Sequence, residues 1–144
     1  LVRQSVPEEL AELKLDDHSV YVETAVTKAE QSHGLMFHPR MSRNDGMLFI
    51  YPAEGPHEFW MKNPLIPLDI AFFNKEGLLL NVVSMDLYPD PAHPPADYPK
   101  AVSVAPAQFV LEVNRGWFSE KGLIDASGKP VKPLRLILPT DYMK

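Results

Sequence analysis

Two acidic residues inside apolar segments are the first candidates for chemistry. Asp69 and Glu112 each lie within a short run of aliphatic and aromatic residues. A carboxylate in such a run is costly to bury unless a cation or hydrogen-bond donors accompany it. The cations considered as partners are Lys62, Arg115 and Arg40. We expect Lys62 to pair with Asp69, because only a few residues separate the two along the chain.

These acids permit two interpretations. In the functional one, Asp69 and Glu112 form a carboxylate pair that Lys62 tunes, for acid–base catalysis in a small hydrolase or lyase or for an oxygen-preferring metal. In the structural one, they pair with or cap nearby backbone groups, and Glu112 steadies a helix that starts at Asn114. We favour the structural interpretation, because structural ion pairs also cluster and shift pKa values.

The segment around Trp60 combines aromatic, charged and amide side chains. If residues 57–62 are extended, alternation puts Phe59 on one face and Trp60 with Lys62 on the other. That second face is either a lid over a buried ion pair or a small binding platform. Trp60 beside Lys62 and Asn63 could stack on a flat ligand, or it could plug the core, and both alternatives stay open. Trp117 is expected in the core.

Several function classes find no support in the sequence. The net charge is −5 without a basic stripe, which argues against nucleic-acid binding. There is no cysteine, and the five histidines lack metal-ligand spacing, so no metal or cofactor is expected. Nucleophile-elbow, phosphate-loop and dinucleotide motifs are absent. No run of about 18 apolar residues exists, so no membrane span is expected.

Length and composition indicate one domain built mainly of short strands. The 144 residues suffice for one core, and 15 prolines against 7 glycines disfavour long helices. Residues 1–9 are expected to be a poorly ordered lead-in. A start at Leu1 suggests either a removed targeting segment or a trimmed chain.

Periodicity predicts the first half of the chain. Alternating apolar residues on either side of Asp16-Asp17 predict a hairpin. Thr27 and Glu30 have capping-box spacing, with Gly34 expected to end that helix. Further predictions are a turn at Asp45-Gly46, a strand over 47–51, a turn over 52–56 and a hairpin of 68–73 with 78–85.

The second half begins with a proline-rich arm. Residues 86–99 hold five prolines, which favours a stiff functional loop. Strands are predicted over 101–105, 108–113 and 134–138, and Asn114 is predicted to cap a short helix that ends at Gly122. The fold class expected is α+β and mostly β, a barrel-like or sandwich core of seven or eight short strands with two short helices.

Ordered motifs in this chain resemble a known family. The motifs are Gly34-Leu35-Met36-Phe37, Asp45-Gly46-Met47-Leu48-Phe49, Phe59-Trp60-Met61-Lys62-Asn63, Pro67-Leu68-Asp69-Ile70, Leu111-Glu112-Val113-Asn114 and Gly116-Trp117-Phe118. Over residues 18–125 they resemble the prokaryotic domain-of-unknown-function family 192. The resemblance implies a β-rich, often exported domain without an established activity. The positions matching the family's polar motif residues are Asp45, Lys62, Asn63, Asp69, Glu112 and Asn114.

This chain departs from the family pattern in two places. Pro64 stands where the family tends to have threonine, and the cysteines that many members carry near the proline-rich arm are missing. A redox or thiolate role is therefore not expected here.

Three functions are carried forward. The preferred one is a non-catalytic, periplasmic or otherwise exported accessory module that binds a small ligand or an envelope protein through Trp60, Lys62 and the arm 86–99. The second is a small hydrolase or lyase that uses Asp69, Glu112 and Lys62. The third is a purely structural domain whose polar cluster fixes strand register.

Overall fold

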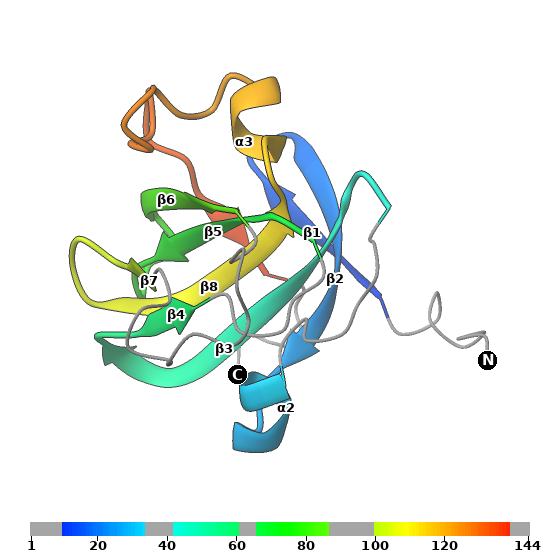
Figure 1. Ribbon diagram of the computed structural model, residues 1–144, viewed down its shortest axis with the longest axis vertical. Helices are drawn as coiled ribbons and strands as arrows, with labels where there is room; N and C mark the ends of the chain where they lie inside the picture. The colour runs from blue at the N-terminus through cyan, green and yellow to red at the C-terminus, as the bar shows by residue number, and fades with distance from the viewer. Residues whose placement is uncertain (1–9, 34–41, 61–65, 87–99, 139–144) are drawn as a thin grey trace.

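A curled sheet of seven strands forms most of the molecule (Figure 1). The structure, a computed structural model, describes residues 10–33, 42–60, 66–86 and 100–138. Its elements are β1 (Ala11–Leu15), β2 (His18–Ala25), α2 (Lys28–His33), β3 (Asp45–Gly55), β4 (Glu58–Trp60), β5 (Leu68–Phe73), β6 (Leu79–Met85), β7 (Lys100–Val102), β8 (Ala107–Asn114), α3 (Trp117–Glu120) and β9 (Leu136–Ile137). The expected class, mostly β with two short helices, is confirmed.

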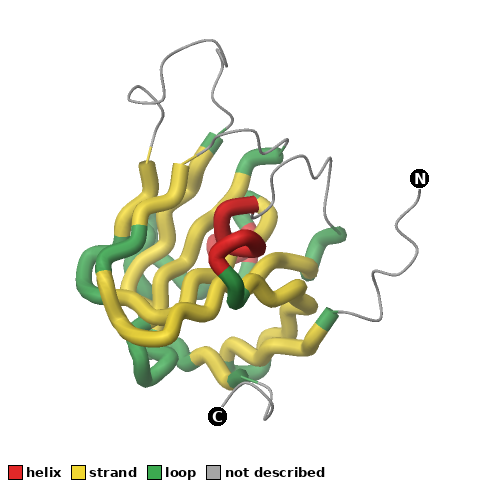
Figure 2. The backbone as a smooth tube through the Cα atoms, turned by 90° about the horizontal axis from the view of Figure 1, so that it is seen from below, coloured by secondary structure: helices red, strands yellow, loops and turns green. Residues whose placement is uncertain are grey.

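The strands of the large sheet follow the order β6-β5-β8-β3-β2-β1-β9. β8 lies between β5 and β3 and pairs antiparallel with both. The sheet curls into a half-barrel, with α2 at one end (Figure 2) and α3 at the other (Figure 1). β9 also approaches the start of β6, where the Leu136 N–H donates to the Gly77 carbonyl at 2.7 Å. None of the described helices is long and apolar enough to cross a membrane.

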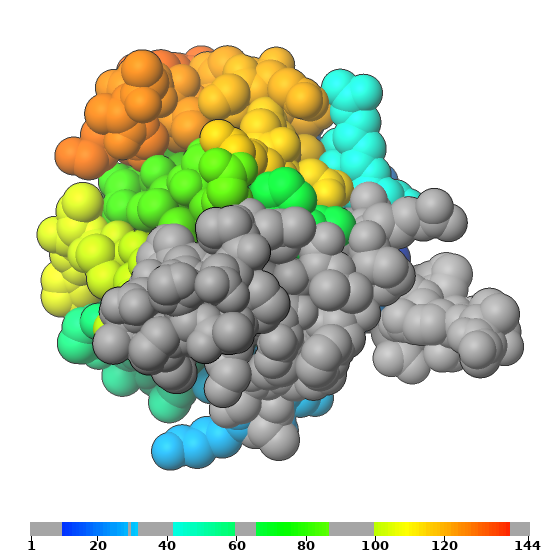
Figure 3. Space-filling view, viewed as in Figure 1, coloured from blue at the N-terminus to red at the C-terminus, as the bar shows by residue number. Residues whose placement is uncertain are grey.

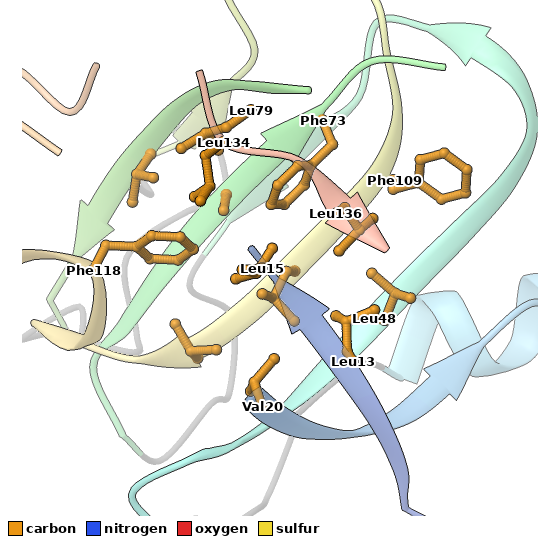
Figure 4. Close-up of a cluster of buried hydrophobic side chains, with 14 of the residues drawn as sticks. Leu13, Leu15, Val20, Leu48, Phe73, Leu79, Phe109, Phe118, Leu134 and Leu136 are labelled. Carbon is orange, nitrogen blue, oxygen red and sulfur yellow. The ribbon is translucent and has the colours of Figure 1, made fainter. Parts of the chain in front are cut away.

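Each face of the large sheet carries its own apolar cluster. The first cluster fills the inside of the curl and includes Leu13, Leu48, Phe73, Leu111 and Phe118 (Figure 4). The second lies on the opposite face and includes Met47, Phe49, Ile70, Phe72 and Val110. Burial on both faces explains why β5 and β8 are almost continuously apolar in sequence.

A small sheet of β4 and β7 covers the second cluster. The Phe59 ring meets Phe49 edge-on at a centroid distance of 5.0 Å and Phe72 at 6.0 Å. Asn81 on β6 fixes the other strand: its amide donates to the Val102 carbonyl, and its oxygen accepts the Val104 N–H. The segment from β7 to β8 forms an exposed corner, yellow-green at the left of Figure 3.

Several local turn and cap predictions are confirmed. β1 and β2 form a hairpin around Asp16-Asp17, and β5 and β6 form the second predicted hairpin. In the capping box, the Glu30 N–H donates to Thr27 Oγ1 at 3.1 Å, and Glu30 Oε1 accepts the Thr27 N–H at 3.1 Å. Gly122 follows α3 in the left-handed conformation, as a helix-ending glycine does.

Several boundaries were predicted wrongly. Asn114 does not cap α3; it remains in β8, and left-handed Gly116 precedes the helix without a side-chain cap. The predicted turn over 52–56 is largely strand, because β3 absorbs an irregularity between Ile50 and Gly55 and continues. Asp45 already belongs to β3, and the turn precedes it.

Some predictions concern residues outside the described part. These are the lead-in 1–9, the helix end at Gly34, the segment with Lys62 and Asn63, and most of the arm 86–99.

The turn at Gly128 packs against β6, and a substitution there tests this contact. A Cβ added to Gly128 (φ +84°) would lie 2.1 Å from the Val82 carbonyl oxygen, whereas one added to Gly122 (φ +71°) meets nothing within 4 Å. We expect Gly128→Ala to lower the free energy of unfolding by about 3 kcal/mol or more, and Gly122→Ala by about 1 kcal/mol, in urea titrations. Equal losses would contradict this packing.

Candidate functional site

The two acids that the sequence singled out lie on opposite faces of the large sheet. Asp69 is directly opposite Val113 in the register of β5 and β8, whereas Glu112 is opposite Ile70. Directly opposed residues point to the same face, and successive residues alternate. Asp69 and Glu112 therefore point away from each other. The structure does not bring them together as an acid–base pair.

Asp69 holds the beginning of α3. It is fully buried, its Oδ1 accepts the Ser84 hydroxyl at 2.6 Å, and its Oδ2 accepts the Gly116 N–H at 3.1 Å. Burial raises the pKa of Asp69, while these hydrogen bonds, one from the Phe118 backbone and the Arg115 charge oppose the increase. The predicted partner Lys62 lies outside the described residues, and the described partners of Asp69 are hydroxyl and backbone donors.

Glu112 lies on β8, inside the sheet, and lacks hydrogen-bond donors like those of Asp69 among the described residues. Its cross-strand neighbours are Met47 on β3 and Ile70 on β5, and the residue is only 6% exposed. Oε1 has no hydrogen-bond partner among the residues that the structure describes. Burial alone raises the pKa of Glu112 from 4.5 to about 8. Glu112 is therefore largely protonated at neutral pH. The predicted role of Glu112 at a helix start is not observed, because α3 begins after Gly116.

Tyr51 and His57 are neighbours that the sequence interpretation missed. Their rings stack with centroids 3.7 Å apart. Burial raises the pKa of Tyr51 to about 12, and the Glu112 charge adds to the increase. Burial also lowers the pKa of His57, against a hydrogen bond to the Ala107 backbone. Neither residue belongs to a recognisable sequence motif. Only their position near β4 could have indicated them.

The His57 tautomer follows from these contacts. Nε2 is buried and has no partner within the described part of the chain. The hydrogen bond to the Ala107 carbonyl therefore comes from Nδ1–H. The neutral ring then presents Nε2 as an unused acceptor.

β4 leads toward the level of Glu112. His57 lies beside Tyr51 and Ala107, while Phe59 lies over Phe49 and Phe72, whose partner on β8 is Val110. The described chain resumes at residue 66, just before Leu68, which is opposite Asn114. Glu112 lies between Val110 and Asn114 on this face. The described residues just before and just after positions 61–65 therefore lie on either side of Glu112 along β8.

The remaining predicted site residues are placed as follows. Asp45 and Asn114 meet at the Ser42 carbonyl, which accepts the Asp45 N–H and the Asn114 amide, each at 3.0 Å. Burial raises the pKa of Asp45, and the Glu23 charge adds to this. The Trp60 backbone belongs to β4, but its side chain lies outside the description, as do Lys62 and Asn63.

Two further observations concern Trp117 and possible metal ligands. Trp117 is buried in the core as predicted, with its indole N–H donating to Asn44 at 3.0 Å. Within residues 10–33, 42–60, 66–86 and 100–138, no three His, Asp or Glu side chains gather as metal ligands would.

Asp69 gives a direct test of its structural role. We expect Asp69→Ala to lower the free energy of unfolding by about 3 kcal/mol, because the Gly116 N–H and the Ser84 hydroxyl both lose a charged acceptor. Ser84→Ala, which leaves the bond to Gly116, should cost about 1 kcal/mol in the same denaturant titration. A loss below 1 kcal/mol for Asp69→Ala would show that the carboxylate does not hold α3.

Two solved structures are similar over nearly the whole chain. One, from Sinorhizobium meliloti 1021, is described as a "putative transcription regulator" and is 27% identical, with a TM-score of 0.71 over 90% of this chain and 95% of that one. The other, from Novosphingobium aromaticivorans DSM 12444, is of unknown function and is 26% identical, with a TM-score of 0.75 over 96% of this chain and 91% of that one. No curated protein matches the chain.

The family comparison agrees with the motifs. The model of the family DUF192, described as an uncharacterized ACR, matches residues 11–129, a range that contains the expected 18–125. The match covers most of the described half-barrel, including Asp69 and Glu112. The chain belongs to the DUF192 family.

Proposed function

We propose that this protein is a non-catalytic binding module that takes a small polar ligand, or a polar group of a partner protein, at the Glu112 face of the large sheet. The observation that carries the proposal is the burial of Glu112 Oε1 without a hydrogen-bond partner among the described residues. An unsatisfied buried polar group costs about 1–3 kcal/mol of stability. A ligand that supplies the missing partner offsets this cost on binding.

The surroundings favour an uncharged ligand group. The pKa of Glu112 is raised, that of Tyr51 is raised and that of His57 is lowered, in each case mainly by burial. All three shifts favour the neutral side chain. An amide or hydroxyl can donate to His57 Nε2 or exchange hydrogen bonds with the Glu112 carboxyl without bringing a charge into this environment.

The small sheet of β4 and β7 connects the Glu112 face with Trp60, which the sequence also proposed for binding. Trp60 on β4 pairs with Lys100 on β7. The chain therefore leaves the small sheet toward Lys62 and Asn63 at the same end where it enters from the arm 86–99. We include these residues from the sequence, as the side chains that would complete the site around Trp60.

The alternatives receive less support. A hydrolase or lyase with Asp69 and Glu112 as acid and base requires side chains that face each other, and these two point to opposite faces. Transcriptional regulation, suggested by the description of one relative, requires a nucleic-acid or protein partner, and the net charge of −5 does not favour nucleic acid. A purely structural role for Glu112 does not account for an oxygen that has no hydrogen-bond partner among the described residues.

We also propose a location in the bacterial envelope, which rests on the family resemblance alone. We expect the full-length protein, produced from its own gene, to fractionate with the periplasm or the membrane envelope. Recovery with the cytoplasmic fraction would remove this part of the proposal without affecting the binding site.

Stability measurements distinguish a ligand site from an architectural one. We expect Glu112→Met to raise the free energy of unfolding at pH 8 by about 1–4 kcal/mol, because an apolar side chain of similar size suits the space between Met47 and Ile70. A loss of stability in urea titrations would instead make Glu112 a structural residue.

The pH dependence follows from the same burial. Glu112 has a folded-state pKa of about 8 against 4.5 for the ordinary group, so the folded state binds the extra proton between these values. The free energy of unfolding should therefore fall by a few kcal/mol as pH rises from about 4.5 to about 8. Glu112→Gln should lose this slope while the slope from other groups remains. Identical slopes in the variant and the parent would contradict the shift.

Ligand binding is tested with a panel of neutral amides, sugars and polyols. We expect at least one compound to raise the melting temperature of the parent protein, and Glu112→Met and Trp60→Ala to lose that shift while keeping a folded melt. If every active compound acts equally on Glu112→Met, the binding site lies elsewhere. If Trp60→Ala does not fold, Trp60 is a core residue.

A further inference from the structure

We propose that a pocket at the α2 end of the half-barrel binds a small hydrophobic carboxylate. This pocket has a volume of about 820 Å³ and lies between the end of β3, the start of β8, the β5–β6 turn and β9. Its volume lies within the range typical of small-molecule sites. Glu112 does not line it, so the inference is independent of the function proposed for the Glu112 face.

The walls of this pocket are apolar. Ile50, Phe109 and Leu136 come from three different strands and belong to the border of the first core cluster. Phe109 lies at one edge of this cluster in Figure 4. Val26 and Ile137 also line the pocket, and they are 52% and 51% exposed. Exposed aliphatic residues beside a buried apolar wall favour an apolar ligand body.

Hydrogen bonds fix these walls in place. The Gln31 amide on α2 donates to the Ile50 carbonyl at 2.9 Å, and the Gln108 amide donates to the Tyr51 carbonyl at 3.1 Å. They satisfy backbone acceptors where the register of β3 becomes irregular. The pocket is therefore preformed, which reduces the ordering cost of binding.

Arg135 supplies the charge at the pocket. Its Nη1 donates to the Glu76 carbonyl at 2.6 Å, which orients the guanidinium while leaving most of its N–H donors unused. The other two described arginines pair with acids, Arg43 with Glu120 and Arg115 with Asp86. Arg135 has no carboxylate partner within the described part of the chain.

Lys75 adds a second cation to the same pocket. Its backbone N–H donates a hydrogen bond to Glu54 Oε2 at 2.7 Å. Its side-chain ammonium has no acidic partner within 4 Å among the described residues. Glu76 is the one acid among the lining residues, and the Glu54 carboxylate lies beside them at the Lys75 backbone N–H. The specific attraction for an anion therefore comes from Arg135, whose planar guanidinium matches a carboxylate through two parallel hydrogen bonds. The apolar walls then accept the rest of the ligand.

Octanoate is the probe for this inference, used below its micelle concentration and observed in ¹H–¹⁵N NMR spectra of the full chain. We expect saturable shifts at Val26, Ile50, Gln108 and Leu136. Octanol and octylammonium, which share the chain but not the carboxylate, should bind about tenfold more weakly or not at all. Absence of saturable octanoate binding, or equal binding of all three compounds, would overturn the proposal.

Variants separate the charge from the walls. Arg135→Gln should weaken octanoate binding about tenfold or more. Ile137→Glu, at an exposed position, should weaken it similarly by placing an acid on the wall and keeps the test open if Arg135→Gln does not fold. Lys132→Gln, outside the pocket, and Glu112→Met should bind as the parent does. Unchanged binding in both pocket variants would place octanoate elsewhere.

Discussion

The pairing of β8 with β3 on one side and β5 on the other is the constraint on which the rest of the structure depends. This register decides the face to which every side chain of β3, β5 and β8 points. Val113 and Asp69 go to the inside of the curl, whereas Glu112 goes to the face under β4. Two acids that are one register step apart therefore occupy separate environments.

These two environments explain the different roles of the acids. Asp69 accepts the Ser84 hydroxyl and the first backbone N–H groups around α3, so its burial is matched by donors. Glu112 lies between Met47 and Ile70 with an oxygen that no described group satisfies. In the proposed function, a ligand supplies the partner that the described residues do not give to this oxygen.

The sequence predicted features whose signals are local. The hairpin at Asp16-Asp17 and the capping box of Thr27 and Glu30 follow from neighbouring residues, and both acids stood out because their neighbours are apolar. The relation between Asp69 and Glu112 could not be predicted, because the register of two strands far apart in the chain decides it. Asn114 was mistaken for a helix cap because β8 continues one residue further than its pattern indicated. His57 and Tyr51 carry no motif, and only the fold brings them together.

The proposed binding site depends on Glu112 being buried and uncharged at neutral pH. Carbon-13 NMR of the glutamate side-chain carboxyl groups, with Glu112→Gln to assign the signal, tests this most directly. The account predicts a titration midpoint near pH 8 for Glu112, the value to which burial raises its pKa. A midpoint near 4.5, the ordinary value for glutamate, would show a solvated carboxylate and contradict the account.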